Sequence, residues 1–301
     1  MVRLAAVTSN TSAEPRLRSM PVLSPGGFVR LAWVEWGPDS AARTAICVHG
    51  LTRNARDFDD LARALAAEGW RVVSVDVPGR GRSGWLRRAE DYAYPFYASA
   101  LAALIGRIGA ERIDWVGTSM GGLIGMMLAA QPDSPIRRLV LNDVGAFIPK
   151  ASLERIAQYV GRDPRFDSVE AVEALLRKVN ASFGPLSDAQ WRHLAVHSAV
   201  KTEDGRWRLG YDPAIAQAFA NAPIADVALW PVWEPIACPT LILRGAESDL
   251  LLRETAEEMT RRGMAAQAGR VELREIPGVG HAPALMALDQ IAAVRDFLAK
   301  E

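Results

Sequence analysis

The sequence predicts an α/β fold in which a mostly parallel sheet is covered by helices on both faces. Short apolar runs alternate with segments of helical periodicity between Ala45 and Leu141. The alternation pauses between Phe147 and Glu234, and it resumes at Pro239 and continues towards the C-terminus. Apolar runs that alternate with amphipathic helices over short connections are typical of parallel βαβ units.

The first part of the chain departs from this pattern. We expect residues 1–16 to form a flexible tail. Two strand-like runs follow, at 17–23 and 28–36, and the turn signal Ser24-Pro25-Gly26-Gly27 separates them. Two such runs around a Pro-Gly turn predict an antiparallel hairpin.

The region of alternating pattern predicts strands and helices in turn along the chain. Buried strands are expected at 45–48, 71–75, 113–116 and 136–141, and helices at 57–68, 96–108 and 120–130. Gly69 and Gly109 directly follow two of these helices, as expected of residues that end a helix. After the pause we expect strands at 240–243 and 270–276, and helices at 253–262 and 284–298.

The paused region is helical, poor in strands and rich in tryptophan. Because the alternation restarts after it, we interpret the region as an insertion into one domain. The sequence therefore predicts a core made of 17–146 and 236–301, with residues 147–235 as a helical insertion.

Composition excludes several classes of function. Lys plus Arg and Asp plus Glu both total 35, so a net charge of zero gives no reason to expect a nucleic-acid partner. Cys47 and Cys238 lie in apolar runs and are expected to be buried thiols. No apolar run approaches the ~20 residues of a membrane span, and no signal segment is evident, so we expect a cytoplasmic protein.

His193 and His197 are the one pair of histidines at helical spacing. We interpret them as a partly buried helix face, because a metal site needs a third ligand and none is evident. The sequence predicts no metal site.

The strongest chemical signal is Gly117-Thr118-Ser119-Met120-Gly121, which lies between a predicted strand and a predicted helix. A tight strand-to-helix turn lifts the Ser119 hydroxyl out of the sheet and places it at a helix N-terminus, where negative charge is favoured. Glycines two residues to either side remove side chains that would collide there. This pattern predicts Ser119 as a nucleophile.

A second signal is His49-Gly50-Leu51, directly after the first buried parallel strand. This loop is expected to supply the backbone N–H of Leu51 to an oxyanion hole, and Met120 supplies the other N–H. Gly50 lets the backbone approach the substrate. We expect His49 to brace the loop rather than to act as the base.

The base and its acid are expected on later loops. His281 follows the last strand in Gly278-Val279-Gly280-His281, where a loop at the carboxyl edge of a sheet can reach the nucleophile. Asp249 follows the strand at 240–243 and gives the order Ser, Asp, His. Glu247 in the same loop and Asp143 at the end of an earlier strand are the two rivals for this role.

These four elements, in this order, resemble the α/β-hydrolase superfamily, and more narrowly its bacterial esterase and carbon–carbon hydrolase branch. The segments 76–83 and 141–145 are also similar to that branch. The resemblance implies an eight-stranded sheet with one antiparallel strand, a helical cap inserted after the sixth strand, and a pocket between cap and core. It also implies that the loop at 76–83 shapes the wall of the active site without supplying a catalytic group.

Two differences from known branches of the superfamily narrow the range of expected activities. Thr118 stands where meta-cleavage-product hydrolases usually have Asn, and Ser119 stands where haloalkane dehalogenases and epoxide hydrolases have Asp. We therefore expect a serine carboxylesterase that acts on a small-molecule ester through an acyl-enzyme and needs no cofactor. A lactonase, a carbon–carbon bond hydrolase or a slow-turnover receptor of the same fold are the alternatives.

The residues that contact the substrate are predicted less directly. Arg53 and Asn54 follow the oxyanion loop and are candidates for polar contacts, together with His49 and Gly50. Trp230 and Trp233 either hold the cap to the core or form an apolar slot for the substrate.

Overall fold

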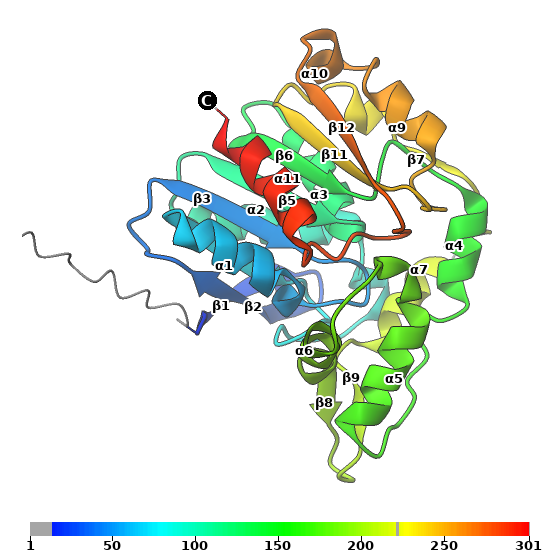
Figure 1. Cartoon of the computed structure of the whole chain (residues 1–301). Coiled ribbons are helices and arrows are strands. Elements are labelled where there is room, and N and C mark those ends of the chain that lie inside the picture. Colours follow the sequence, from blue (N-terminus) through cyan, green and yellow to red (C-terminus); the bar gives the residue numbers. More distant parts are fainter. Residues whose placement is uncertain (1–13, 221–222, 301) are drawn as a thin grey trace, which may run out of the picture.

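An eight-stranded sheet forms the centre of the protein (Figure 1). The computed structural model describes residues 14–220 and 223–300. The strand order is β1-β2-β4-β3-β5-β6-β11-β12. The strands are β1 (Arg16–Ser24), β2 (Gly27–Trp36), β3 (Arg43–Val48), β4 (Trp70–Asp76), β5 (Ile113–Thr118), β6 (Ile136–Asn142), β11 (Thr240–Gly245) and β12 (Val271–Ile276).

The predicted hairpin and parallel sheet are confirmed. β2 pairs antiparallel with both β1 and β4, and all the other neighbours in the sheet are parallel. β2 is thus the single strand that runs against the rest. Of the predicted tail, residues 1–13 lie outside the described residues, and β1 already begins at Arg16.

Helices cover both faces of the sheet (Figure 1). One face carries α1 (Asp59–Ala67) and α11 (Leu288–Ala299), and the other carries α2 (Tyr94–Ile108) and α3 (Met120–Ala129). Successive residues of β3 point to opposite faces: Cys47 packs in the core under α1 and α11, and Ile46 in the core under α2 and α3. Both cysteines are free thiols, and Cys238 is only half-buried.

Residues 147–235 add no strand to the main sheet. In Figure 1 the part around α5, α6, β8 and β9 projects away from the sheet. Its longer elements are α4 (Lys150–Ala157), α5 (Val169–Val179) and α6 (Asp188–Ser198). Its short elements are β7 (Phe147–Ile148), η3 (Ala181–Phe183), β8 (Ala199–Lys201), β9 (Trp207–Leu209), η4 (Pro213–Ala216), α7 (Gln217–Ala220), β10 (Val227–Ala228) and α8 (Trp230–Trp233).

The remaining elements connect the strands of the core. They are η1 (Ala55–Phe58), η2 (Ala89–Asp91), α9 (Arg253–Met259) and α10 (Met264–Gln267). Within the described residues, no helix is both long and apolar enough to cross a membrane.

The topology brings the candidate catalytic residues to one edge of the sheet. The parallel strands β3, β5 and β6 lie side by side, so the residues that follow them meet at their common carboxyl edge. These residues include His49, Ser119 and Asp143, and the loop after β12 brings His281 to the same edge.

Candidate active site

Ser119 occupies a strained turn between β5 and α3. Its backbone has φ 51° and ψ −116°, in the left-handed half of conformational space that non-glycine residues rarely adopt. A methyl group on Gly117 would collide with the Gly121 backbone, and one on Gly121 would collide with the Val48 carbonyl. Both glycines are therefore required, as the motif predicts, and the turn holds the hydroxyl clear of the sheet.

His281 lies within proton-transfer reach of Ser119. The Ser119 hydroxyl and His281 Nε2 are 3.0 Å apart, a normal hydrogen-bond distance. The histidine loop is tied to η3, because Gly280 N donates to the Ser182 carbonyl and the Ser182 hydroxyl donates to the His281 carbonyl, both at 2.7 Å. The predicted serine–histidine pair is therefore assembled in the folded chain.

Asp143 completes the chain of hydrogen bonds. His281 Nδ1–H donates to Asp143 Oδ2 at 2.7 Å, and the Asp143 side chain is fully buried. The same carboxylate accepts hydrogen bonds from Gly245 N and from the Ser248 hydroxyl. Since a carboxylate only accepts, the proton must lie on Nδ1, and Nε2 is left free to accept from Ser119.

The prediction that Asp249 orients His281 is wrong. The Asp249 side chain is 53% exposed and forms a bidentate ion pair with Arg155 of α4. Glu247, the other rival in this loop, is exposed as well. The loop after β11 reaches the site through Ser248, whose hydroxyl donates to Asp143, and the next residue therefore points away.

The two predicted oxyanion donors lie beside the serine. Leu51 and Met120 line the same cavity as Ser119. Met120 is the first residue of α3, so its N–H has no acceptor within the helix. In the part of the chain that the structure describes, the Leu51 N–H also makes no hydrogen bond within the protein. A Cβ on Gly50 would stand 3.7 Å from Ser119 Cβ, which agrees with the expected close approach of this loop.

His49 braces the loop from inside the protein. It is 1% exposed, its Nδ1–H donates to the Gly50 carbonyl at 2.7 Å, and its Nε2 accepts from Val77 N at 3.0 Å. Burial lowers the pKa of His49 to about 3, so the ring is neutral. The bracing role is what the sequence predicts, and the ring does not line the cavity that holds Ser119.

Four residues predicted to contact the substrate lie elsewhere. Arg53 pairs with Asp57, and Asn54 caps η1. Trp230 packs under the Arg262 guanidinium, and Trp233 is buried with its Nε1–H donating to the Arg262 carbonyl. None of the four lines the cavity that reaches Ser119, so the structure gives these predicted contacts no support. Both tryptophans hold the end of the 147–235 segment to the core.

Arg80 is a residue of the site that sequence reasoning missed. Its side chain is fully buried at the cavity wall, where Nε donates to the Leu51 carbonyl and Nη1 donates to the Pro78 carbonyl and the Tyr97 hydroxyl. Its Nη2 lies 3.6 Å from Met120 Sδ. None of the ion pairs among the described residues involves Arg80. A buried guanidinium thus contacts both Leu51 and Met120, the two residues predicted to form the oxyanion hole.

The cavity that ends at Ser119 has a volume of about 450 Å³. Its wall is mainly apolar and combines residues of the sheet domain with Ile148, Leu153, Ile156, Ile215 and Phe219 of the 147–235 segment. A second cavity, of about 490 Å³, shares with it Tyr94, Leu123, Ile148, Leu153 and Phe219. The two cavities are therefore neighbours across a common wall, and only the first of them reaches the serine.

Comparison with known proteins agrees with this geometry. Residues 45–294 match the model of the alpha/beta hydrolase family. The chain belongs to the alpha/beta hydrolase family. This hydrolase is 46% identical over 294 residues to a 3-hydroxybutyrate-oligomer hydrolase from Cupriavidus necator, an alignment that covers 95% of this chain and 98% of the relative.

More distant relatives of this hydrolase extend the comparison. It is 28% identical over 239 residues to an esterase from Mycobacterium tuberculosis, with 76% of this chain and 74% of the relative covered. A solved alpha/beta hydrolase from Novosphingobium aromaticivorans superposes with a TM-score of 0.82 at 37% identity, over 95% of this chain and 99% of that structure. The predicted superfamily and its eight-stranded fold are confirmed.

Proposed function

We propose that this hydrolase cleaves carboxylic esters through Ser119, His281 and Asp143. The observation that carries the proposal is the unbroken chain of hydrogen bonds from Ser119 through His281 to Asp143, at 3.0 Å and 2.7 Å. His281 accepts the serine proton while the oxygen attacks the ester carbonyl, and Asp143 stabilises the imidazolium that forms. His281 then returns the proton to the departing alkoxide.

The N–H groups of Leu51 and Met120 would hold the negative oxygen of the tetrahedral intermediate. Each such donor is worth about 3–4 kcal/mol of transition-state stabilisation in related chemistry. The α3 helix adds its positive N-terminal end at the same point. A water activated by His281 then attacks the acyl-enzyme and releases the acid.

The substrate we propose is a short oligomer of 3-hydroxybutyrate. The Cupriavidus necator relative carries this activity in its name, and the alignment covers nearly the whole of both chains. An ester of this kind has a methyl branch and a short methylene backbone, which suit a mainly apolar wall. Two neighbouring cavities provide room for more than one unit on the way to Ser119.

Residues 147–235 would act as the cap over this site. Support comes from the side chains they contribute to the cavity wall and from Ser182, which holds the loop of His281. The cap would then both shape the pocket and position the catalytic base.

The test is hydrolysis of synthetic 3-hydroxybutyrate dimer and trimer, followed by the release of 3-hydroxybutyrate, beside a series of p-nitrophenyl esters. Wild-type protein should turn over the oligomers, and Ser119→Ala should lose at least about 10³-fold in kcat. Ser134→Ala, just before β6 and therefore at the opposite edge of the sheet from the site, is the control for the substitution itself. Activity that persists in Ser119→Ala would refute the mechanism, whereas activity on p-nitrophenyl esters alone would refute only the proposed substrate.

A further inference from the structure

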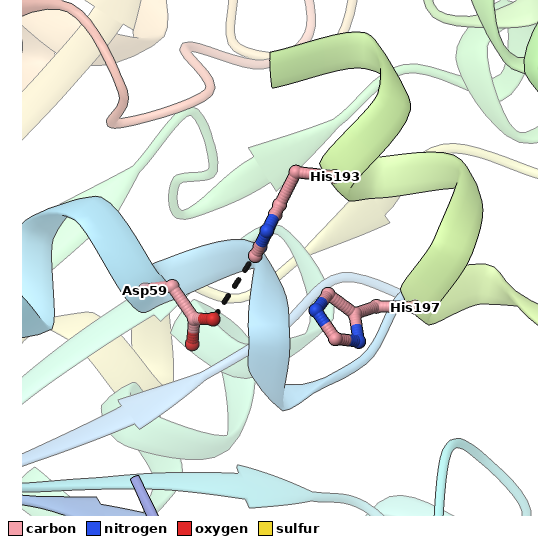
Figure 2. A group of neighbouring side chains, drawn as sticks. All are labelled: Asp59, His193 and His197. Carbon is pink, nitrogen blue, oxygen red and sulfur yellow. Dashed lines mark ion pairs between the residues drawn. The ribbon is translucent and has the colours of Figure 1, made fainter. Parts of the chain in front are cut away.

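A second group of polar side chains lies away from the serine, where α6 packs against η1 and α1. His193 and His197 are one helical turn apart on α6, and Asp59 is the first residue of α1 (Figure 2). One ligand atom from each of the three lies within 4.8 Å of the others, and His193 Nε2 is 3.4 Å from Asp59 Oδ2. The third ligand that the sequence did not show is thus brought in by the fold.

The donor set is that of a transition-metal site. Two imidazoles and one carboxylate are common ligands of Zn²⁺, which leaves the fourth position to water. Tetrahedral ligands at about 2.0–2.1 Å from the ion stand closer together than the present spacing, so the side chains must draw in. His197 is free to do so, because it is half-exposed and its ring makes no hydrogen bond within the described residues. His193 Nε2 contacts the Arg56 carbonyl at 2.9 Å and has to give up this hydrogen bond to bind the ion.

The carboxylate of Asp59 is satisfied on one oxygen only. The residue is 1% exposed, and its Oδ1 has no hydrogen-bond partner. A buried carboxylate oxygen without a donor is unfavourable and is rare in folded proteins. Its Oδ2 is held by the Arg56 guanidinium at 2.6 Å. The oxygen that faces His193 is Oδ2, so a cation would give Oδ1 the partner it lacks only if both carboxylate oxygens bind it.

We infer that Asp59, His193 and His197 bind one divalent transition-metal ion of the zinc class. The ion joins α6, in the 147–235 segment, to α1, in the sheet domain. Asn54 already bridges the same junction, since its side chain donates to the His197 carbonyl at 3.2 Å. Binding of the ion therefore fixes the 147–235 segment against α1, next to the Asn54 contact, and it does so without touching the serine.

Arg56 lowers the affinity of this site for a metal ion. Its guanidinium occupies the oxygen of Asp59 that faces His193, so the ion has to displace it or share the carboxylate with it. The positive charge beside the ion also opposes binding. Removal of the guanidinium should tighten metal binding, an effect that a merely structural histidine pair would not produce.

The experiment measures Zn²⁺ binding by calorimetry on the full chain after treatment with a chelator, and Co²⁺ binding by its visible absorption. Wild-type protein should bind one ion, and Zn²⁺ should raise its Tm because the ion binds only the folded state. His197→Ala should weaken binding at least about tenfold, Arg56→Gln should tighten it, and His281→Ala should bind as wild type does.

Three results would overturn the inference. They are the absence of binding by wild-type protein, equal affinity in wild type and His197→Ala, and loss of binding in His281→Ala, which would place the ion at the serine site instead. Should His197→Ala unfold, His197→Asn tests the same ligand with a smaller loss of packing. Because the readouts are binding and Tm, failure of the proposed ester hydrolysis would leave this test unaffected.

Discussion

Asp143 Oδ2 lies 2.7 Å from His281 Nδ1, although 138 positions separate the two residues in the sequence. Asp143 directly follows β6, the neighbour of β5, and its backbone is left-handed with φ 55°. Gly245 N and the Ser248 hydroxyl hold the other sides of the carboxylate. The acid is thus fixed by three donors at the carboxyl edge of the sheet, one strand away from Ser119.

The first prediction compares the two aspartates. Asp143→Asn should lower kcat by about 10³–10⁴-fold, because an amide at this position no longer fixes the required tautomer of His281. Asp249→Asn, the matched control, should leave kcat within about twofold, since its exposed ion pair with Arg155 contributes little. Steady-state kinetics on a p-nitrophenyl ester measures both. A larger loss in Asp249→Asn than in Asp143→Asn would restore the assignment made from the sequence.

This pair shows where sequence reasoning succeeds and where it stops. The alternation of strands and helices predicts β3, β4, β5, β6, β11 and β12 and the helices between them, because buried strands and amphipathic helices have different periods. Strand order also predicts that Ser119 and His281 meet at one edge. Both Asp143 and Asp249 follow strands that end at this edge, so position alone does not separate them. Which aspartate contacts His281 depends on the side-chain direction of one residue in a loop, and the periodicity of a sequence does not predict that direction.

Other features of the structure could not be predicted from the sequence for similar reasons. β7 and β10 are two residues long, too short to show alternation. Trp230 and Trp233 have the size of pocket residues, yet their contacts are with Arg262, 29 to 32 positions later in the chain. Arg80 lies in a glycine-rich loop where an arginine is normally exposed, and only the fold buries it beneath Leu51.

The second prediction concerns Arg80 as a positioning residue. Arg80→Met should lower kcat by about tenfold or more while KM changes little, because Leu51, whose N–H is a proposed oxyanion donor, loses the guanidinium that fixes its carbonyl. Arg80→Lys keeps the charge but not the planar fork, so it should restore only part of the rate. A Tm measurement on each variant separates this effect from unfolding. An increase in KM at unchanged kcat would instead show that Arg80 acts on substrate binding.

The third prediction contrasts two glycines. Gly121→Ala should destabilise the protein by about 3 kcal/mol or more, because the new methyl group meets the Val48 carbonyl, which belongs to a rigid central strand. Gly106, within α2, has no atom within 4 Å of an added Cβ. Gly106→Ala should therefore stabilise the protein by about 0.5–1 kcal/mol through its higher helix propensity. Urea unfolding of both variants measures these changes, and equal effects would contradict the packing argument.

The fourth prediction concerns the pH dependence of stability. Burial lowers the pKa of His49 to about 3, below its unfolded value, so the unfolded chain binds an extra proton between these two pH values. The stability due to neutral His49 is thus fully present above about pH 6.5 and is lost as the pH falls towards 3. At pH 5 the loss from this residue alone is about 2 kcal/mol.

His49→Gln isolates this effect. The variant keeps a polar side chain at the position but has no titrating group. Its free energy of unfolding, measured in urea at pH 7 and pH 5, should fall by about 2 kcal/mol less than that of wild type between these values. His197, whose pKa burial also lowers to about 3, is present in both proteins and does not affect the comparison. Parallel pH profiles would show that His49 is protonated without loss of the fold.

The last prediction tests whether the two cavities act together on longer substrates. Leu153 of α4 lies in the wall that the cavity at Ser119 shares with the second cavity. Leu153→Trp fills space at this boundary, so kcat/KM for the 3-hydroxybutyrate trimer should fall about tenfold relative to that for p-nitrophenyl acetate, which needs only the space next to Ser119. Leu153→Ala widens the boundary and should shift the same ratio the other way. If both variants change kcat/KM for the two substrates by equal factors, the second cavity does not receive the chain, and the oligomer must extend from the serine by another path.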